Sequence, residues 1–221
     1  MKRKLAMAVV LAVVVILPGL YFAWPLLTGR AAWLEAGQPP RGEQDPKAPP
    51  QDPKAKRRPT TASRPLNVAG VPNLHRVSKD VYRGAQPSEE GFRELKRMGI
   101  RTVVNLRHYH SSRWEAENAD LVYEHIAIKG WHGTMGDAIR FLAIIADNKR
   151  TPVFVYCNDG AARTGFLCAA YRVAMCGWSP KSAVAEMTHE RFGSDIEFRN
   201  LVRRIEEMDV KRLKRAAGLP E

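Results

Sequence analysis

The stretch from Pro152 to Cys176 constrains the fold more than any other part of the chain. It opens with the run PVFVYC, which is typical of a strand buried in the interior of a sheet. A short loop with one glycine follows at once, and a helical stretch then extends from Thr164 to about Cys176, where Gly177 can end it. A buried strand that leads directly into a helix is typical of α/β proteins, so this stretch predicts a central sheet flanked by helices.

The residues on either side of this stretch support the same fold class. Short β-branched or alternating segments predict further strands, and apolar residues at helical spacing predict helices. Ser88 and Ser179 are expected to cap two of the helices. We therefore expect one α/β domain over residues 66–221 with a mostly parallel sheet, strands near 81–84, 101–106, 121–128 and 152–157, and helices near 88–98, 137–148, 164–176, from 180 onward, and 195–208.

The first 28 residues have the composition of a membrane segment. Cations at positions 2–4 precede an uncharged run from Leu5 to Leu27, which as a helix would cross the roughly 30 Å hydrocarbon core of a bilayer. No A-x-A cleavage site follows the run. We therefore expect an uncleaved signal anchor over residues 1–28, rather than a cleaved secretion signal or a buried soluble helix.

The position of the charges sets the expected orientation of this anchor. Because the basic cluster precedes the span, the amino terminus should stay in the cytoplasm, and the domain should face the periplasm from a bacterial inner membrane. Residues 29–65 are rich in proline and in charged side chains and offer little to bury. They are expected to form a disordered, loosely extended tether.

The net charge of +12 argues against nucleic acid as a partner. Residues 1–65 carry 11 Lys and Arg against 4 Asp and Glu, a net of +7, so more than half of the net charge precedes the domain. A nucleic-acid-binding protein would concentrate its positive charge on the folded domain. We expect instead a phosphorylated protein or a small phosphorylated substrate as partner, with the membrane contacted through the amino-terminal helix.

The cysteines exclude two further kinds of site. Cys157, Cys168 and Cys176 are odd in number and match no zinc spacing, and a domain of this size needs no disulfide scaffold. We therefore expect no metal and no cofactor. Cys168 and Cys176 are expected to occupy core or semi-buried positions on the helix that follows the glycine-containing loop.

The loop from Cys157 to Thr164 combines the groups that bind and attack a phosphate ester. Its amides and the start of the next helix favour negative charge, which stabilises a thiolate at Cys157. Gly160 lets successive amides converge on an anion, Arg163 can bind two phosphate oxygens, and Thr164 can donate its hydroxyl to the sulfur. The competing interpretation is a cysteine that is merely buried at a strand end. We predict a phosphoryl-transfer site whose phosphate-binding residues are Asn158, Asp159, Gly160, Ala161, Ala162 and Arg163.

The pattern C-x5-R-[ST] of this loop resembles the cysteine-based protein tyrosine and dual-specificity phosphatases. The segments VYRGAQPS at 81–88, GIRTVVNLR at 99–107 and YEHI at 123–126 are similar to the bacterial dual-specificity-type branch of that superfamily. The resemblance runs from near residue 70 to near residue 210. It implies a protein tyrosine phosphatase-like fold, a phosphocysteine intermediate on Cys157, and no metal.

Three features depart from that family pattern. Tyr156 stands where the family usually has histidine before the nucleophile, and Ala162 stands where many bacterial relatives have an acid before the arginine. The stretch 128–132, where dual-specificity enzymes carry their general acid, contains no carboxylate. The candidates for the general acid are therefore Asp159, His132 and Asp137, unless the site works without one.

Each of these candidates has a second interpretation. Asp159 could repel a phosphate dianion, His132 could be a histidine of a surface loop, and Asp137 could cap the helix that follows it. Basic residues elsewhere are ambiguous in the same way. The group Arg107, His108, His110 and Arg113 could line the mouth of the site or form a solvated loop, and the basic residues at 211–215 are expected to form a solvated final turn.

Two functions of different classes fit this pattern. The first is hydrolysis of a phosphate monoester, with protein phosphotyrosine or phosphoserine/threonine as substrate, or an inositol pyrophosphate, on which related plant and fungal enzymes act. The second is a pseudophosphatase that binds a phosphorylated partner without turnover, as the departures from the family pattern suggest. Sulfur transfer and arsenate reduction are further reactions of cysteine loops. Turnover of a generic aryl phosphate would separate an enzyme from a binding protein.

Overall fold

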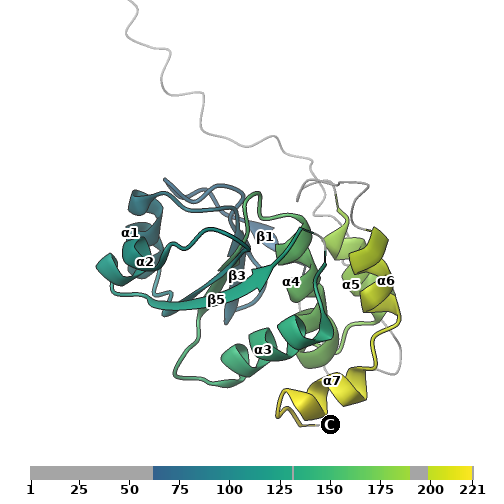
Figure 1. The fold of residues 1–221 in the computed structure, drawn as a ribbon. Helices are drawn as coiled ribbons and strands as arrows, with labels where there is room; N and C mark the ends of the chain where they lie inside the picture. Colours follow the sequence, from purple (N-terminus) through teal and green to yellow (C-terminus); the bar gives the residue numbers. More distant parts are fainter. Residues whose placement is uncertain (1–61, 131, 190–198, 221) are drawn as a thin grey trace, which may run out of the picture. The chain divides into compact units, whose positions relative to one another are not determined.

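A computed structural model describes residues 62–130, 132–189 and 199–220 (Figure 1). The expected anchor over residues 1–28 and almost all of the expected tether lie outside these ranges. None of the helices in the described ranges is long and apolar enough to cross a membrane. The described ranges therefore cover most of the expected α/β domain.

One sheet of six strands forms the centre of the described fold, in the spatial order β1-β2-β3-β6-β4-β5. The four longer strands run parallel to one another, and the two short strands add to the sheet antiparallel at the β3 edge. This arrangement confirms the expected α/β class with a largely parallel sheet. The strands are β1 (Arg64–Pro65), β2 (His75–Arg76), β3 (Val81–Gly84), β4 (Thr102–Arg107), β5 (Val122–Ile128) and β6 (Val153–Tyr156).

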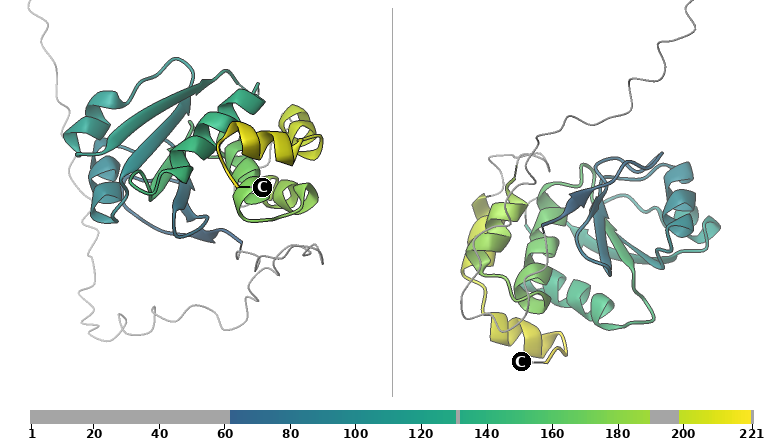
Figure 2. Two further views of the ribbon diagram at one scale, coloured as in Figure 1. Left: turned by 90° about the horizontal axis from the view of Figure 1, so that it is seen from below. Right: turned by 180° about the vertical axis from the view of Figure 1, so that it is seen from behind.

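Helices cover both faces of this sheet (Figures 1 and 2). On one face, α1 and α2 pack on a smaller core that includes Phe154 and Tyr156. On the other face, α3 to α7 pack on a larger core that includes Val153, Val155 and Cys157. The helices are α1 (Glu89–Arg97), α2 (Arg113–Asn118), α3 (Met135–Ala146), α4 (Ala162–Met175), α5 (Pro180–Met187), α6 (Arg199–Glu206) and α7 (Val210–Ala216).

The position of β6 explains why its sequence is apolar without alternation. β6 lies between β3 and β4, and its successive side chains enter the two cores in turn. A strand that is covered on both faces has no solvent side for polar residues. The prediction of a buried strand followed by a helix is therefore confirmed, and it places Cys157 at the carboxyl end of a central strand.

Hydrogen bonds at the helix starts confirm both predicted caps. The hydroxyl of Ser88 accepts from the backbone N–H of Gly91 at 3.1 Å, and that of Ser179 accepts from Ser182 at 3.1 Å. Each cap satisfies a backbone donor that has no partner inside its helix. Polar side chains before a helical run thus located the starts of α1 and α5 from the sequence.

Two expectations about helices were wrong. α3 begins at Met135 rather than at Asp137, because Thr134 is its cap and forms a reciprocal capping box with Asp137. The basic stretch near the carboxyl end lies on the helix α7 rather than in a final turn; Lys211, Arg212 and Arg215 are exposed as expected, but Leu213 between them is fully buried. The predicted helix over 195–208 is described from residue 199, as α6, and its first four residues lie outside the described ranges.

The described domain includes residues that composition had assigned to the tether. β1 lies at residues 64–65, and Ser63 before it is buried. Both the backbone N–H and the hydroxyl of Ser63 donate to Oε1 of Glu186, at 2.8 and 3.0 Å. Glu186 of α5 also binds the guanidinium of Arg172 of α4 through both its oxygens, at 2.8 and 2.9 Å. A buried ion pair therefore joins the start of the described domain to α4 and α5.

Candidate active site

Cys157 lies at the point where the carboxyl ends of three parallel strands meet. It follows β6 directly, is only 2% exposed, and is flanked by the ends of β3 and β4. Residues 158–161 connect it to α4. In open α/β sheets this edge is where ligands bind.

Gly160 allows the loop to pack against the end of β3. Its φ of 72° lies in the left-handed region, and a Cβ placed there would be 2.4 Å from the carbonyl carbon of Gly84. Any side chain would therefore displace the loop or the strand. The single glycine of the loop is required by both its backbone angle and its close contact with β3.

The carbonyl groups of the loop are bound from outside it. The backbone N–H of Gln86 donates to Asn158 O at 3.1 Å, and the side-chain amide of Asn73 donates to Asp159 O at 2.8 Å. The guanidinium Nη2 of Arg83 donates to the next two carbonyls along the loop, at 2.7 and 3.2 Å. Four successive carbonyls, those of residues 158–161, are thus held by groups outside the loop.

The amide groups of the same four residues are not used in this way. No described residue accepts a hydrogen bond from the backbone N–H groups of residues 158–161. Successive N–H groups of a glycine-containing turn that leads into a helix form an anion-binding concavity. The loop therefore offers a set of donors beside the buried sulfur of Cys157.

Arg163 adds a positive charge to this set of donors. It is half-buried in the first turn of α4, and Nη1 lies 3.5 Å from the carbonyl oxygen of Leu106, near the end of β4. This is its one hydrogen bond to the described residues, and it is long. The remaining donors of the guanidinium fork can bind an oxyanion.

Thr164 is fully buried, and its hydroxyl has no hydrogen-bond partner among the described residues. A buried hydroxyl without a partner is unusual, because leaving it unsatisfied costs about 1–3 kcal/mol. Thr164 follows Arg163 directly in the first turn of α4. The loop and this turn therefore contain both an amide array and a hydroxyl whose donors are available to a ligand or to a thiolate.

The three candidates for the general acid lie in different surroundings. Asp159 is on the exposed rim of the loop, and its carboxylate accepts from the side-chain amide of Asn158 at 2.7 Å. Asp137 accepts from both the N–H and the hydroxyl of Thr134, at 2.8 and 2.7 Å. The second interpretation of Asp137, as part of a helix cap, is therefore the one that its contacts show.

His132 lies in the connection between β5 and α3. Its ring is exposed, and Nδ1 lies 3.2 Å from the carbonyl oxygen of Lys129. The next residue, Gly133, packs on Phe166 of α4 so closely that a Cβ there would be 2.7 Å from the ring. This contact brings the connection against the second turn of α4, one turn beyond Arg163.

Tyr156 replaces the expected histidine with a packing residue. Its side chain points to the face opposite Cys157, where it stacks on Phe154 at 5.6 Å and meets the edge of Phe92 at 6.0 Å. Burial raises the pKa of the Tyr156 phenol far above its usual value. This position therefore belongs to the smaller core rather than to the chemistry of the loop.

One wall of the site is a hydrogen-bond network, of which the sequence analysis identified one member, Arg107, as a candidate. Arg107 at the end of β4 donates to Oε1 of Gln86 at 2.7 Å, and the amide of Gln86 donates to Ser112 at 3.1 Å. Gln86 thus connects β4, the start of α2 and the loop carbonyl of Asn158. Arg113, by contrast, forms an ion pair with Glu117 at 3.1 Å and lies over the ring of Tyr123, so it does not join this wall.

Arg83 is a residue of the candidate site that the sequence analysis did not identify. A charged residue in a four-residue strand is usually placed on a solvent-facing side, yet Arg83 is 1% exposed. The spacing of two residues between Val81 and Arg83 could have indicated this, because residues two apart in a strand share a face and Val81 is apolar. That face lies under α4.

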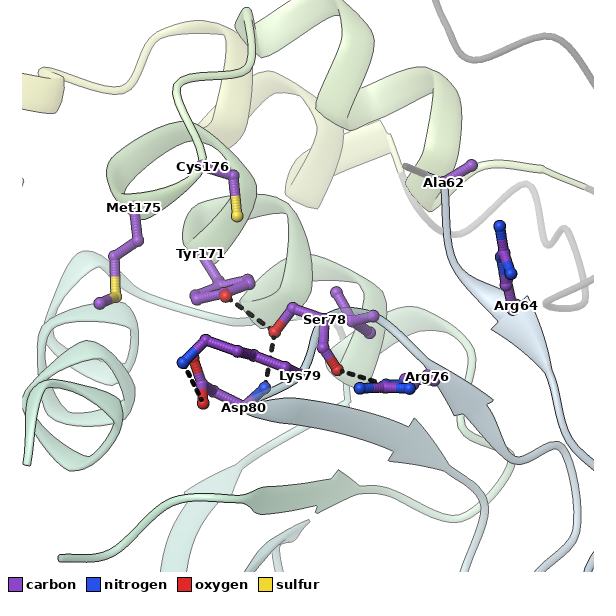
Figure 3. A pocket seen from close by; sticks show the side chains of 10 residues that line it. Ala62, Arg64, Arg76, Ser78, Lys79, Asp80, Tyr171, Met175 and Cys176 are labelled. Atoms are coloured by element: carbon purple, nitrogen blue, oxygen red, sulfur yellow. Dashed lines mark hydrogen bonds and ion pairs between the residues drawn. The ribbon is translucent and has the colours of Figure 1, made fainter. Parts of the chain in front are cut away.

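A cavity of about 550 Å³ lies elsewhere in the domain (Figure 3). Ser78 from the turn before β3 and Tyr171 and Cys176 from the end of α4 line it, and the hydroxyl of Tyr171 donates to Ser78 at 2.9 Å. None of its lining residues belongs to the loop at Cys157. Nowhere in the described ranges do three or more His, Cys, Asp or Glu side chains gather as they would around a metal ion.

Known proteins resemble this chain both in sequence and in structure. The dual specificity protein phosphatase TpbA of Pseudomonas aeruginosa strain PAO1 is 28% identical over 148 residues, which are 65% of this chain and 66% of TpbA, so the chain spans just under two thirds of that relative. The crystal structure of P. aeruginosa TpbA matches with a TM-score of 0.63 at 25% identity, over 71% of this chain and 96% of that one.

A more distant structure shares the fold alone. The core catalytic domain of the PP-IP phosphatase SIW14 from S. cerevisiae matches with a TM-score of 0.59 at 21% identity, over 69% of this chain and 94% of that one. The model of one protein family, described as PTP-NADK, a DSP-PTPase phosphatase fused to NAD+ kinase, matches residues 71–203. These residues are more than half of the chain and contain the whole loop from Cys157 to Thr164, and the chain therefore belongs to this family of dual-specificity-type, cysteine-based phosphatases.

Proposed function

We propose that this protein hydrolyses phosphate monoesters by nucleophilic attack of Cys157. The observation that carries the proposal is the loop itself: four successive carbonyls bound from outside, and the amides of the same residues without acceptors, beside a buried cysteine. Membership of a phosphatase family supports the same reaction.

In the first step the phosphate group occupies the loop. Its equatorial oxygens accept hydrogen bonds from the loop amides and from the Arg163 fork, which neutralise the charge that is shared among them in the transition state. The Cys157 thiolate attacks phosphorus, the S–P bond forms, and the bond from phosphorus to the ester oxygen breaks. The alcohol or phenol leaves with a proton, and Cys157 carries the phosphoryl group.

In the second step water replaces the sulfur. Water attacks phosphorus, the S–P bond breaks, and inorganic phosphate leaves as the thiolate forms again. The buried hydroxyl of Thr164 can donate to that thiolate and so assist its departure. This role gives the Thr164 hydroxyl the partner that it lacks among the described residues.

The leaving group takes up a proton as the ester bond breaks. Asp137 is engaged in the cap of α3, which leaves Asp159 on the rim and His132 beside α4 as donors from the protein. A phenol needs less help than an alkyl alcohol, because the phenolate is the more stable anion. The site is therefore suited first to aryl phosphates such as phosphotyrosine.

Protein phosphotyrosine is accordingly the substrate that we propose. TpbA has been crystallised in a complex with pTyr. In this chain the exposed rings of Tyr109 and Trp114 lie in the segment that follows β4, and β4 pairs with β6 so that Asn105 is opposite Tyr156, next to Cys157. Aromatic rings at the mouth of a site can pack against a phosphotyrosyl ring or its neighbours. Inositol pyrophosphates are the second class of substrate to test, and the support for them is the fold shared with SIW14.

The proposal also includes a membrane location. The uncharged run of Leu5–Leu27 behind three cations would hold the domain on the periplasmic side of a bacterial inner membrane. Fusions of alkaline phosphatase and of a fluorescent protein at Glu221 would test this in a bacterial host. An active alkaline phosphatase fusion is expected, whereas an inactive one beside a bright fluorescent fusion would contradict a periplasmic domain.

The activity itself is tested with the full chain and p-nitrophenyl phosphate. Wild-type protein should turn the substrate over, and C157S should not, while both bind inorganic phosphate. A wild-type protein that binds phosphate without any turnover would make the protein a pseudophosphatase. Loss of turnover on EDTA treatment that a divalent ion restores would contradict a mechanism that runs on the cysteine alone.

A further inference from the structure

We propose that Arg83 is a positioning residue for this reaction: it fixes the phosphate-binding loop from beneath and favours the thiolate form of Cys157. The proposal rests on the proposed function, because it assigns a role within the same site. It concerns a residue of β3 that lies far from the loop in sequence and does not touch the substrate.

The location of Arg83 is the first support. β3 and β6 are parallel neighbours, with Arg83 opposite Val155, two residues before Cys157. Arg83 shares the face of Val81, which belongs to the larger core under α4. A Cβ on Gly165 of α4 would lie 3.5 Å from Nη2 of Arg83. The guanidinium is thus enclosed by the sheet, the loop and the first turns of α4.

The hydrogen bonds of Arg83 are the second support. A single nitrogen, Nη2, donates to the carbonyls of Gly160 and Ala161 at 2.7 and 3.2 Å. Holding these carbonyls toward β3 turns the peptide units so that their N–H groups can face an anion in the loop. The two N–H donors of Nη2 have directions fixed by the plane of the guanidinium, whereas the three donors of an ammonium group rotate on a flexible stem.

The charge of Arg83 is the third support. Burial lowers the pKa of Arg83, and the neighbouring Cys168, Glu186 and Cys157 act in the opposite direction. A buried cation and a nearby thiolate stabilise each other, because little water separates them. Burial raises the pKa of Cys168 to about 11, so that thiol stays protonated near neutral pH. Among the two thiols that Arg83 affects, Cys157 alone also adjoins the loop amides.

Other charged or titratable groups adjoin the loop and must be kept constant in a test. They come from the end of β4, from the loop, and from α4, and they are Arg107, Asp159, Arg163 and Cys168. Arg172 provides a matched control for Arg83. It is buried as deeply, but its guanidinium binds Glu186 and donates to no carbonyl of the loop in the described contacts.

The test compares R83M, R83K and R172M in the full chain. The rate of alkylation of Cys157 by iodoacetamide is measured against pH, with the modified residue identified by mass spectrometry, and thermal unfolding is followed in parallel. R83M is expected to shift the midpoint of the Cys157 alkylation profile upward by about one pH unit, equivalent to about tenfold less thiolate at low pH. R172M is expected to lower the melting temperature and leave that midpoint unchanged.

R83K separates the effect of the charge at position 83 from that of the guanidinium geometry. It also provides the test if R83M does not fold. The lysine should keep the alkylation midpoint near that of the wild type, yet the protein should bind inorganic phosphate about tenfold more weakly, because a freely rotating ammonium on a flexible stem does not fix both carbonyls in one orientation. A folded R83K with wild-type phosphate binding, or an R172M that shifts the alkylation profile as much as R83M, would overturn the proposal. Neither readout needs turnover, so a chain without phosphatase activity would contradict the proposed function and leave this test intact.

Discussion

Polar groups at the two ends of α4 differ in whether they have hydrogen-bond partners. At its start, the loop amides of residues 158–161 and the buried hydroxyl of Thr164 have no partner among the described residues. At its far end, the hydroxyl of Tyr171 binds Ser78, and Arg172 binds Glu186 and lies over the ring of Trp178 at 4.3 Å. Thr164 near the start of the helix and Arg172 near its end are both fully buried.

This difference separates function from stability along a single helix. Unsatisfied buried donors destabilise a fold, so they persist where a ligand satisfies them. Satisfied donors stabilise the fold and are of no use to a ligand. We therefore expect substitutions at the start of α4 to change the chemistry and leave the fold intact, and substitutions at its end to do the reverse.

C157S should have the largest effect. Replacing the sulfur by a hydroxyl is expected to lower kcat for p-nitrophenyl phosphate by about a thousandfold or more, because a serine hydroxyl does not ionise at this position near neutral pH. The melting temperature should change little. Single-turnover and steady-state rates of the full chain measure this, and retention of more than a few per cent of the activity would remove Cys157 from the role of nucleophile.

E186A should have the largest effect on stability. It removes the carboxylate that Arg172 binds, and breaking a buried pair costs about 3–5 kcal/mol of unfolding free energy. Activity of the protein that remains folded should stay within a few-fold of wild type. Urea unfolding measures the stability, and an activity loss as large as that of C157S would break the separation between the two ends.

The pH dependence of unfolding sharpens this second prediction. Burial by itself would raise the pKa of Glu186, but the hydrogen bonds and charge of Arg172, together with Ser63, hold the pKa below its usual value. A carboxyl group whose pKa is lowered in the folded state stabilises that state at pH values above the ordinary carboxyl pKa. This stabilisation is lost as the pH falls through the lowered pKa. The wild type should therefore lose stability on acidification more steeply than E186Q.

R163K should have an intermediate effect on chemistry alone. The lysine keeps a positive charge but cannot bind two phosphate oxygens as a fork, so kcat/KM is expected to fall about a hundredfold. Because Arg163 makes only one long hydrogen bond to the described residues, thermal unfolding should be nearly unchanged. Near-normal kinetics in R163K would count against the loop as the phosphate site.

Y171F should have the smallest effect. It removes one partly buried hydrogen bond, that to Ser78, and should lower the unfolding free energy by about 1 kcal/mol. Hydrolysis of p-nitrophenyl phosphate should be unaffected, because Tyr171 lies at the far end of α4 from Cys157. A measurable loss of kcat without loss of stability would show that the two ends communicate.

The parts of the site that the sequence could predict are local ones. The apolar run before Cys157, Gly160 in the loop and Arg163 in the first turn are close in the chain, and each is constrained by backbone geometry or charge within a few residues. The same holds for the caps at Ser88 and Ser179. Local rules therefore located the main helices and the loop.

The parts that could not be predicted depend on contacts between distant segments. Arg83 and Asn73 bind the loop from about 80 residues away, and β1 and β2 are too short to show a pattern. α7 was hidden because only Leu213 in its basic sequence is fully buried. Whether Tyr156 lies in the smaller core or beside the loop depends on the face of β6 that its side chain occupies, and that face depends on the register of the sheet.

The bond from Ser63 to Glu186 determines where this chain can be shortened. A fragment that begins at Leu66, the boundary that composition suggests, would lack β1 and the two donors that Ser63 gives to Glu186. The buried carboxylate of Glu186 would keep the two donors of Arg172 but lose the two of Ser63, which are half of the four described here. A fragment that begins at Ala62 keeps both donors of Ser63, so a fragment of this domain made for crystallisation or screening should begin no later than Ala62.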